Sequence, residues 1–186
     1  VSKINTIADG TAVQTPGDKL FPYLQANVDH VLTVDDSELT LSFLDMAENH
    51  KMIVENSGLL TVAALKHLDF KGKKVVSVLS GGNMDVLTMA TVVQNGLMQR
   101  DRIFTVSVML PDKPGQLAAV SSLIAKEQGN VIKLEHNVFA NVNRTAGVEL
   151  TITLESFGTE HKDQIIKALE AAGYCPVITK TNGIYM

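Results

Sequence analysis

Two kinds of hydrophobic pattern alternate along the first half of the chain. Apolar residues recur every three or four positions in four segments, which predicts amphipathic helices over 18–27, 35–49, 58–68 and 85–98. Between them lie three short apolar runs, at 29–34, 52–55 and 73–79. Those at 29–34 and 73–79 have the length and β-branched character of buried strands. Strands that alternate with helices indicate a parallel α/β sheet with helices on its faces.

A glycine turn follows the most strand-like of these runs. Val75–Leu79 is apolar or small throughout, and Ser80-Gly-Gly-Asn83 separates it from a helix whose N-cap we expect at Asp85. A strand, a glycine turn and a helix N-terminus can together present backbone N–H groups and a hydroxyl to a ligand. The pattern is equally typical of an ordinary strand-to-helix turn, so by itself it leaves both interpretations open.

The pattern changes after the charged segment Gln99-Arg-Asp-Arg102. Strands are predicted at 103–110, 131–140, 147–155 and 174–179, and helices at 116–128 and 159–172. A polar hairpin loop is expected at 141–145. The order β-α-β-β-α-β predicts a ferredoxin-like unit. We therefore expect two domains, residues 1–98 and 102–186.

Composition narrows the classes of function. The formal net charge is −4 and no Lys/Arg stripe with interleaved aromatic residues occurs, so nothing indicates a nucleic-acid partner. The only cysteine, Cys175, excludes a disulfide framework and a cysteine-rich zinc site, and it suits the cytoplasm, where we expect the protein to act. No apolar run approaches the roughly 20 residues of a membrane span, and the histidines lack metal-ligand spacing. We expect neither a membrane segment nor a metal site.

Four short motifs follow one another between residues 6 and 83. They are Thr6-Ile-Ala-Asp-Gly10, Val28-Asp29 with Val34-Asp-Asp-Ser-Glu38, Val54-Glu55, and Leu79-Ser-Gly-Gly-Asn83. In content, order and approximate spacing they resemble the threonine dehydratase (threonine ammonia-lyase) family, pyridoxal-phosphate enzymes of the tryptophan-synthase-β type. Serine racemase shares the same set, so the motifs mark the superfamily more sharply than the substrate.

A second group of motifs lies beyond residue 102. Leu110-Pro-Asp-Lys-Pro-Gly-Gln-Leu117 occupies the first predicted strand-to-helix turn, Gly129-Asn-Val131 opens the second strand, and His136 follows in it. These motifs resemble an ACT domain, a small ligand-binding module. The catalytic-plus-ACT order resembles threonine dehydratases and not serine racemase. The resemblance implies an α/β fold: the parallel-sheet half of a tryptophan-synthase-β-like (type II) pyridoxal-phosphate fold plus a ferredoxin-like βαββαβ ACT domain.

Two features of that family are missing from this sequence. The family binds its cofactor covalently through a lysine in a Lys-x-Arg-Gly-type motif, and no lysine here is followed by Arg-Gly. The glycine-rich phosphate loop of the family is missing as well. Both normally precede the motif that ends at Gly10. We therefore expect the chain to be the C-terminal portion of a longer enzyme and to be inactive alone.

The resemblance assigns roles to residues of the four motifs. Ser80 is expected to hydrogen-bond the pyridine nitrogen of pyridoxal 5'-phosphate, while Gly81 and Gly82 let the backbone approach a flat ring. Asn83 is expected to orient the turn or cap the following helix. Gly10 corresponds to a loop near the ring face, and Glu55 is the candidate catalytic carboxylate near the pyridine ring. Two simpler interpretations stay open, a plain Asp-Gly turn for Gly10 and a solvated strand end for Glu55.

The ACT motifs imply an effector site. Asp112, Gly115 and Gln116 lie at a helix N-terminus, where backbone N–H groups can bind the carboxylate of an amino acid. ACT domains commonly pair, and the ligand then lies between this turn and the segment with Asn130 and Val131 of a neighbouring copy. We expect isoleucine or valine as effector and a homo-oligomer, a dimer or tetramer. A turn without ligand, in a domain that only associates, remains the alternative.

The expected function is therefore the pyridoxal-phosphate-dependent deamination of L-threonine to 2-oxobutanoate and ammonia, in isoleucine biosynthesis or threonine catabolism, with effector binding at the ACT domain. The alternative is an isolated, non-catalytic regulatory or self-association fragment that binds a branched-chain amino acid. In either case an exposed parallel-sheet edge in residues 1–98 would favour association.

Overall fold

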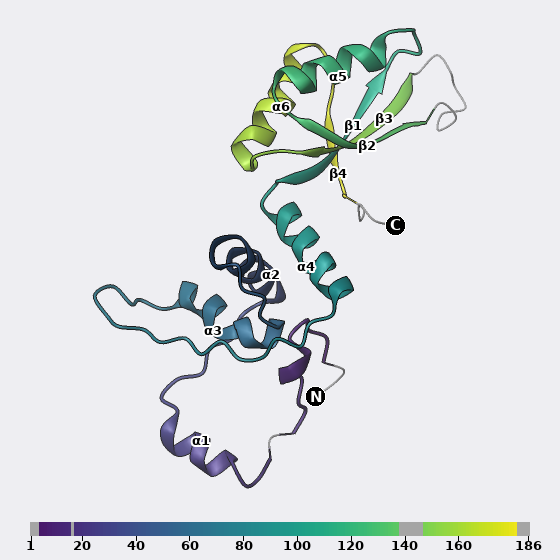
Figure 1. Ribbon diagram of the computed structural model, residues 1–186. Helices are drawn as coiled ribbons and strands as arrows, with labels where there is room; N and C mark the ends of the chain where they lie inside the picture. The colour runs from purple at the N-terminus through teal and green to yellow at the C-terminus, as the bar shows by residue number, and fades with distance from the viewer. Residues whose placement is uncertain (1–3, 16, 138–146, 182–186) are drawn as a thin grey trace. The chain divides into compact units, whose positions relative to one another are not determined.

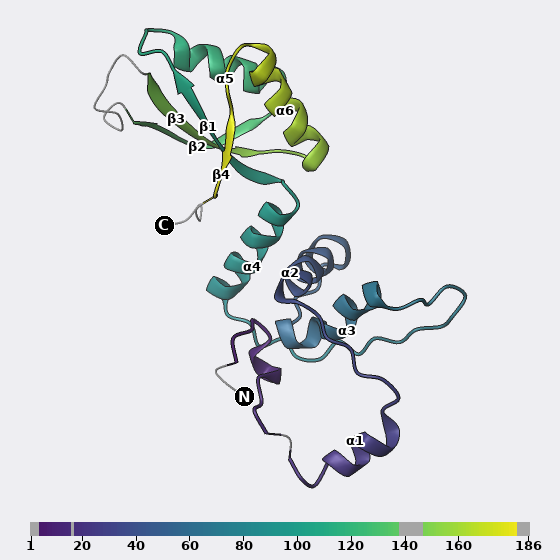
Figure 2. The same cartoon turned by 180° about the vertical axis from the view of Figure 1, so that it is seen from behind.

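The computed structural model describes residues 4–15, 17–137 and 147–181. The chain forms two compact units, Val1–Gly96 and Leu97–Met186. Figures 1 and 2 show the helical elements of the first unit and the sheet with its two helices in the second.

The first unit is built from short helices. Its α-helices are α1 (Phe21–Asn27), α2 (Asp36–Asp45), α3 (Leu60–Ala63) and α4 (Val86–Gln99), the last of which runs past the boundary of the unit. Tighter or wider helical turns are η1 (Asp9–Thr11), η2 (Met46–His50), η3 (Asn56–Leu59) and η4 (Ala64–His67). The predicted helix over 58–68 is thus three short pieces, and the predicted helix over 35–49 ends in the π-helical turn η2.

One apolar cluster forms the core of this unit. Its buried members come from the N-terminal loop, α2, the 54–63 segment and α4: Ala8, Leu39, Phe43, Met46, Val54, Leu59, Ala63 and Val92. The start of α2 has a capping box, in which the backbone N–H of Asp35 donates to Glu38 Oε2 at 3.0 Å. This cap and the apolar face of α2 follow directly from the local sequence.

Three local predictions for the first unit are wrong. The runs 29–34 and 73–79 are extended but do not pair as strands, and within the described residues of this unit no sheet forms. A strand requires ladder hydrogen bonds to a neighbour, and the described chain supplies none to these runs. Val76 is accordingly 89% exposed instead of buried. The helix expected from Asp18 begins at Phe21, with Leu20 and not Asp18 as its N-cap.

The second unit has the predicted βαββαβ order. Its strands are β1 (Ile103–Leu110), β2 (Asn130–Asn137), β3 (Val148–Glu155) and β4 (Val177–Thr179), and its helices are α5 (Gln116–Lys126) and α6 (Thr159–Ala171). The sheet is antiparallel in the order β2-β3-β1-β4, and α5 and α6 cover one of its faces (Figures 1 and 2). The core lies between these layers and includes Val106, Val108, Val120, Ile124, Leu150, Ile152, Leu154, Ile165 and Leu169.

The start of the last strand in this unit differs from the prediction. The last strand begins at Val177 and not at Tyr174, because the backbone N–H of Tyr174 still donates to Leu169 O at the end of α6. Gly173, with φ of 87°, is the predicted residue that ends this helix. The end of the strand predicted over 131–140 and the hairpin loop at 141–145 fall on residues 138–146, outside the described residues.

Candidate functional site

Glu55 contacts the glycine turn at residues 80–83 through both its backbone and its side chain. The backbone N–H of Glu55 donates to the carbonyl oxygen of Gly81 at 3.4 Å. Its carboxylate oxygen Oε2 accepts a hydrogen bond from the backbone N–H of Asn83 at 3.1 Å. Glu55 follows the buried Val54 and is itself partly exposed. The residue predicted as a catalytic carboxylate therefore lies directly against the turn predicted to bind the cofactor.

Two glycines make this close packing possible. Gly81 has a φ of 78°, and a Cβ at this position would lie 2.2 Å from Cδ of Glu55. At Gly58, a Cβ would lie 1.8 Å from the carbonyl oxygen of Ser80. A side chain at position 58 would have to displace the backbone of the turn, whereas one at position 81 would displace the Glu55 carboxylate. Gly82, in contrast, has only Ile53 O at 4.0 Å from such a Cβ.

The N-terminal loop brings Gly10 to the same place. A Cβ on Gly10 would lie 2.9 Å from Ser57 Oγ and 3.7 Å from Glu55 Oε1. The loop is held from both sides: Asp36 Oδ2 accepts a hydrogen bond from Ile7 N–H at 3.1 Å, and Asn56 Nδ2 donates to Ile7 O at 3.0 Å. Gly10 and Asn83, which are 73 positions apart in sequence, thus meet at Glu55.

Asp85 anchors the helix that follows the turn. Its carboxylate oxygen Oδ1 accepts hydrogen bonds from the backbone N–H groups of Leu87 at 2.9 Å and Thr88 at 3.0 Å, which is the predicted N-cap. The Thr88 hydroxyl hydrogen-bonds the same carboxylate and is the largest cause of its lowered pKa, followed by the Thr88 backbone N–H. Ser80 itself is exposed, so its hydroxyl is accessible to a ligand.

Sequence reasoning missed the residues that follow Glu55. Asn56 holds the N-terminal loop, Ser57 lies against Gly10, and Gly58 lies against Ser80. Within the described part of the chain, Ser57 Oγ and Asn56 Oδ1 are buried without a hydrogen-bond partner. The only signal in the sequence is the run of small and polar residues Asn56-Ser-Gly58 after an apolar segment, which by itself predicts a turn.

The predicted effector residues of the second unit lie at opposite ends of the sheet. Asp112, Gly115 and Gln116 follow the end of β1, whereas Asn130 and Val131 begin β2. In the strand register, Asn130 and the first residue of β1 both pair with Glu155 on β3. The length of β1, seven steps of about 3.4 Å, separates the two groups by about 24 Å. One copy of the chain therefore does not bring the two groups together.

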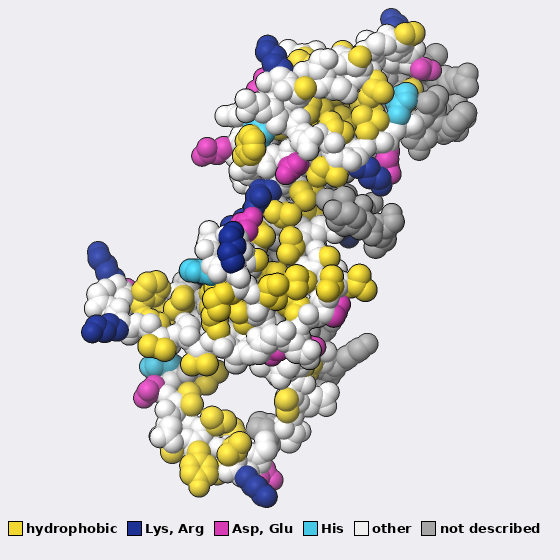
Figure 3. Space-filling model, in the orientation of Figure 1, with side chains coloured by type: hydrophobic (Ala, Val, Ile, Leu, Met, Phe, Trp, Pro, Cys, Tyr) yellow, Lys and Arg dark blue, Asp and Glu magenta, His cyan; other side chains and the backbone are white. Residues whose placement is uncertain are grey.

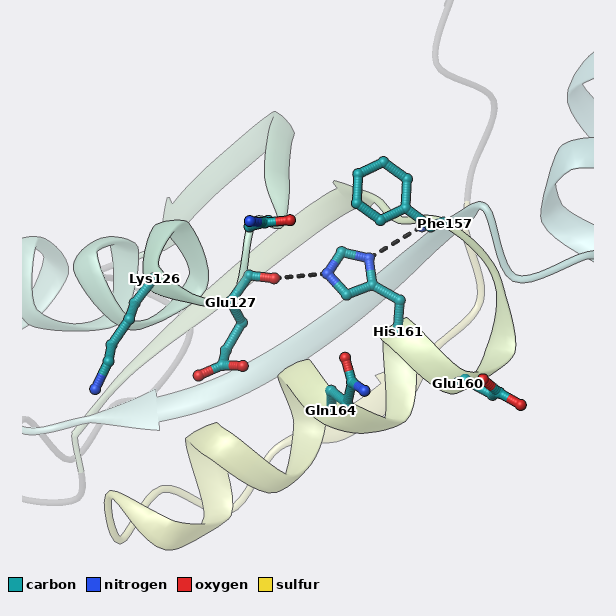
Figure 4. Close-up of a pocket in the computed structure, with 7 residues that line it drawn as sticks. Lys126, Glu127, Phe157, Glu160, His161 and Gln164 are labelled. Atoms are coloured by element: carbon teal, nitrogen blue, oxygen red, sulfur yellow. Dashed lines mark hydrogen bonds between the residues drawn. The ribbon is translucent and has the colours of Figure 1, made fainter.

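Two hollows at the surface of the second unit have the volume of a small-molecule site. One, of about 500 Å³, adjoins the predicted effector turn and includes Gln116; it is lined by Met109, Leu110, Pro111, Gln116, Gly147, Ala172, Gly173 and Tyr174. The other, of about 400 Å³, lies where α5 ends and α6 begins, and none of the predicted residues contributes to it (Figure 4). There His161 Nδ1 accepts from Phe157 N–H at 3.0 Å and Nε2 donates to Glu127 O at 2.6 Å, so both ring nitrogens are used structurally.

Two family models match the chain. Residues 1–81 match the pyridoxal-phosphate dependent enzyme family, and residues 104–173 match the ACT domain. The chain thus places a segment similar to pyridoxal-phosphate dependent enzymes before a segment similar to an ACT domain. The predicted fold class and the cofactor class of the family are confirmed by these matches and by the antiparallel ferredoxin-like sheet.

Curated relatives that match nearly the whole chain are L-threonine ammonia-lyases and an L-threonine dehydratase. L-threonine ammonia-lyase of Geobacter sulfurreducens is 36% identical over 94% of this chain and 44% of its own length. L-threonine ammonia-lyase of Thermotoga maritima is 34% identical over 91% of this chain and 42% of its own length. The biosynthetic L-threonine dehydratase IlvA of Pasteurella multocida is 28% identical over 100% of this chain and 37% of its own length. The predicted resemblance to the C-terminal portion of a threonine dehydratase is confirmed, and the chain spans less than half the length of these relatives.

The described residues also bear on metal binding and membrane spans. Among the described residues, no group of three or more His, Cys, Asp or Glu side chains has the geometry of a metal site. In the same part of the chain, no helix combines the length and apolar character needed to cross a bilayer.

Proposed function

We propose that this chain is part of a pyridoxal-phosphate-dependent enzyme that deaminates L-threonine to 2-oxobutanoate and ammonia, in isoleucine biosynthesis or threonine catabolism. The observation that carries the proposal is the meeting of Gly10, Glu55, Gly81 and Asn83 at one place. These residues belong to separate motifs of the family, and no local pattern requires them to be neighbours. Residues 1–98 would be the catalytic portion and residues 102–186 the ACT-type regulatory domain, in a cytoplasmic protein.

The residues at this site suit a flat, polar ring. Gly10, Gly81 and Gly82 present backbone without side chains, and Ser80 presents an exposed hydroxyl. We assign Ser80 to the pyridine nitrogen of pyridoxal phosphate. A neutral hydroxyl carries no negative charge that would stabilise a protonated pyridine nitrogen. It therefore leaves that nitrogen largely unprotonated. The bound cofactor supplies the electron sink for elimination of the hydroxyl group of threonine.

The covalent anchor is proposed to come from residues outside this chain. No lysine here is followed by Arg-Gly, and the relatives are more than twice as long as the part they share with this chain. The chain alone should therefore bind no cofactor covalently and should not turn over threonine.

Borohydride trapping with mass spectrometry, together with an assay for 2-oxobutanoate, tests this directly. The 186-residue chain is mixed with pyridoxal phosphate and treated with borohydride, which reduces any Schiff base to a stable adduct, and its mass is then measured by mass spectrometry. The intact protein is the control. We expect a reduced cofactor adduct at one lysine and 2-oxobutanoate formation only in the intact protein. Threonine turnover by the isolated chain would contradict the assignment of the lysine. An intact protein that deaminates no threonine would refute the proposed activity.

We also propose that the ACT domain binds isoleucine or valine between two copies of the chain. The separation of Gln116 from Asn130 by the length of β1 supports a site shared by the turn of one copy and the β2 start of another. Such a site would make the protein a dimer or tetramer. Calorimetry with each amino acid, with Gln116→Ala and Asn130→Ala as variants, tests it: both variants should weaken binding, and absence of heat at concentrations above about 1 mM would refute it.

One observation favours a second candidate function, a non-catalytic fragment that associates with itself and binds a branched-chain amino acid. The unpaired segment 73–79 exposes Val75, Val76 and Val78, and Figure 3 shows hydrophobic side chains at the surface of both units. Exposed apolar surface of this kind is typical of an association site. A sedimentation experiment on the chain alone, over a range of concentrations, distinguishes a self-associating fragment from a monomer.

A further inference from the structure

The turn at residues 80–83 is held at Ser80, Gly81 and Asn83 by the segment 55–58. Glu55 binds the turn twice, through the Gly81 carbonyl oxygen and the Asn83 N–H. Gly58 lies so close to the Ser80 carbonyl oxygen that a single Cβ would reach 1.8 Å from it. The Glu55 N–H and the Gly58 backbone belong to one short segment, which ends in the buried Leu59. The place of Ser80 therefore depends on residues 55–58.

We propose that Glu55 and Gly58 are positioning residues, which set the Ser80 hydroxyl in place for the cofactor and do not act on the substrate. The inference rests on the proposed function of this site, because it needs Ser80 to bind the ring nitrogen. It replaces the role that the sequence suggested for Glu55, a carboxylate that takes part in the reaction. Gly58 had no predicted role.

The Glu55 carboxylate acts as a clamp on the turn, which here means that it holds the turn in place by one accepted hydrogen bond and by packing against Gly81. One oxygen is used by the Asn83 N–H, and Cδ fills the space that a side chain at position 81 would occupy. A clamp of this kind needs an acceptor oxygen at the right distance, and it does not need a negative charge. Glutamine has the same length and keeps an acceptor oxygen, whereas alanine has no acceptor. Aspartate keeps the charge but is one methylene shorter, so its carboxylate lies short of Asn83.

This difference defines the experiment. In the intact protein, Glu55→Gln, Glu55→Ala and Glu55→Asp are compared with wild type and with Glu170→Gln, an exposed carboxylate of α6. The measured quantities are the dissociation constant for pyridoxal phosphate, the absorbance spectrum of the bound cofactor, and kcat and KM for threonine. Melting of the cofactor-free variants by circular dichroism reports whether each one folds.

Rescue by glutamine is the expected signature. Glu55→Ala and Glu55→Asp should raise the dissociation constant about 10-fold, the effect of losing one hydrogen bond that involves a charged group, and should shift the absorbance of the bound cofactor. Glu55→Gln should stay within about threefold of wild type in both the dissociation constant and kcat. Gly58→Ala should reproduce the spectral shift with Glu55 intact, because it displaces the Ser80 carbonyl.

Other results overturn the inference in distinct ways. A Glu55→Gln variant that binds the cofactor like wild type but loses kcat by two orders of magnitude would show that the carboxylate acts in the reaction. Equal affinities and spectra for wild type, Glu55→Ala and Glu55→Asp would show that the clamp does not position Ser80. Failure of the wild-type intact protein to bind pyridoxal phosphate would refute the proposed function, and this inference with it.

Discussion

Asp101 joins the start of the sheet in the second unit to the first turn of α6, and its carboxylate should contribute measurably to the stability of that unit. Lys162 Nζ lies 2.7 Å from Oδ1, and the Thr159 hydroxyl donates to Oδ2 at 2.8 Å. Partial burial, the largest single effect, raises the pKa of Asp101. The hydrogen bonds from Lys162 and Thr159 together outweigh burial and hold this pKa below its ordinary value.

The perturbation is Asp101→Asn. Asp101 has a φ of 54°, in the left-handed region, which asparagine tolerates nearly as well as aspartate. The substitution therefore removes the charge with little change in backbone preference. Hydrogen bonds to a charged group contribute about 1.5–3 kcal/mol. The side chain of Asp101 is 27% exposed and that of Lys162 is 18% exposed, so water screens part of this electrostatic stabilisation. We expect Asp101→Asn to lower the free energy of unfolding by about 1–2 kcal/mol at pH 7.

The effect should depend on pH in one direction. The pKa of Asp101 is lower in the folded protein than in the unfolded chain, where it is about 3.9. The stabilisation is therefore fully present above the unfolded value and is lost as the pH falls through the folded value. The difference in free energy of unfolding between wild type and Asp101→Asn should be constant from pH 7 to about pH 5 and should shrink below about pH 4.

The difference in free energy of unfolding between wild type and Asp101→Asn is measured by urea unfolding. Monitoring the NMR intensities of amides in β1 and β3 restricts the measurement to the second unit. The matched control is Glu135→Gln, which removes a 2.8 Å ion pair to Lys133 whose side chains are both more than half exposed. It should change stability by less than about 0.5 kcal/mol. The reasoning is refuted if Asp101→Asn costs no more than the control, or if its cost is the same at pH 7 and pH 3.

Two glycine substitutions make further predictions for the second unit. Gly147→Ala should destabilise it by about 2–3 kcal/mol, because the position has a φ of 104° and the new Cβ would lie 2.7 Å from Leu110 O; the melting temperature measures this. Gly129→Ala should cost about 1–3 kcal/mol in urea unfolding, because its Cβ would crowd the side chains of Ile124 and Ile165. Gly17→Ala is the control, because nothing lies within 4 Å of the added Cβ. It should change stability by no more than about 0.5 kcal/mol. Equal effects for all three substitutions would contradict the steric argument.

The candidate site was only partly predictable. The motif residues Gly10, Glu55 and Ser80 were found through their resemblance to a family, and the N-cap at Asp85 followed from local pattern. That Glu55 packs on Gly81 could not be read from the sequence, since the two are 26 positions apart and no periodicity links them. The role of Gly58 was equally hidden, because a glycine that permits backbone contact looks the same in sequence as one in a loop.

The sequence alone determined the local features of this protein. The hydrophobic pattern predicted β3, α5 and α6, and Asp85 predicted the start of α4, because each depends on side chains within a few positions of one another. Only the tertiary structure decided which apolar runs pair. Ile103–Leu110 finds partners on both sides and is a buried strand, whereas the run 73–79 finds none and stays exposed, although both are rich in β-branched residues. The physical reason is that a strand is stabilised by hydrogen bonds to a neighbour, and a neighbour is not a property of the run itself.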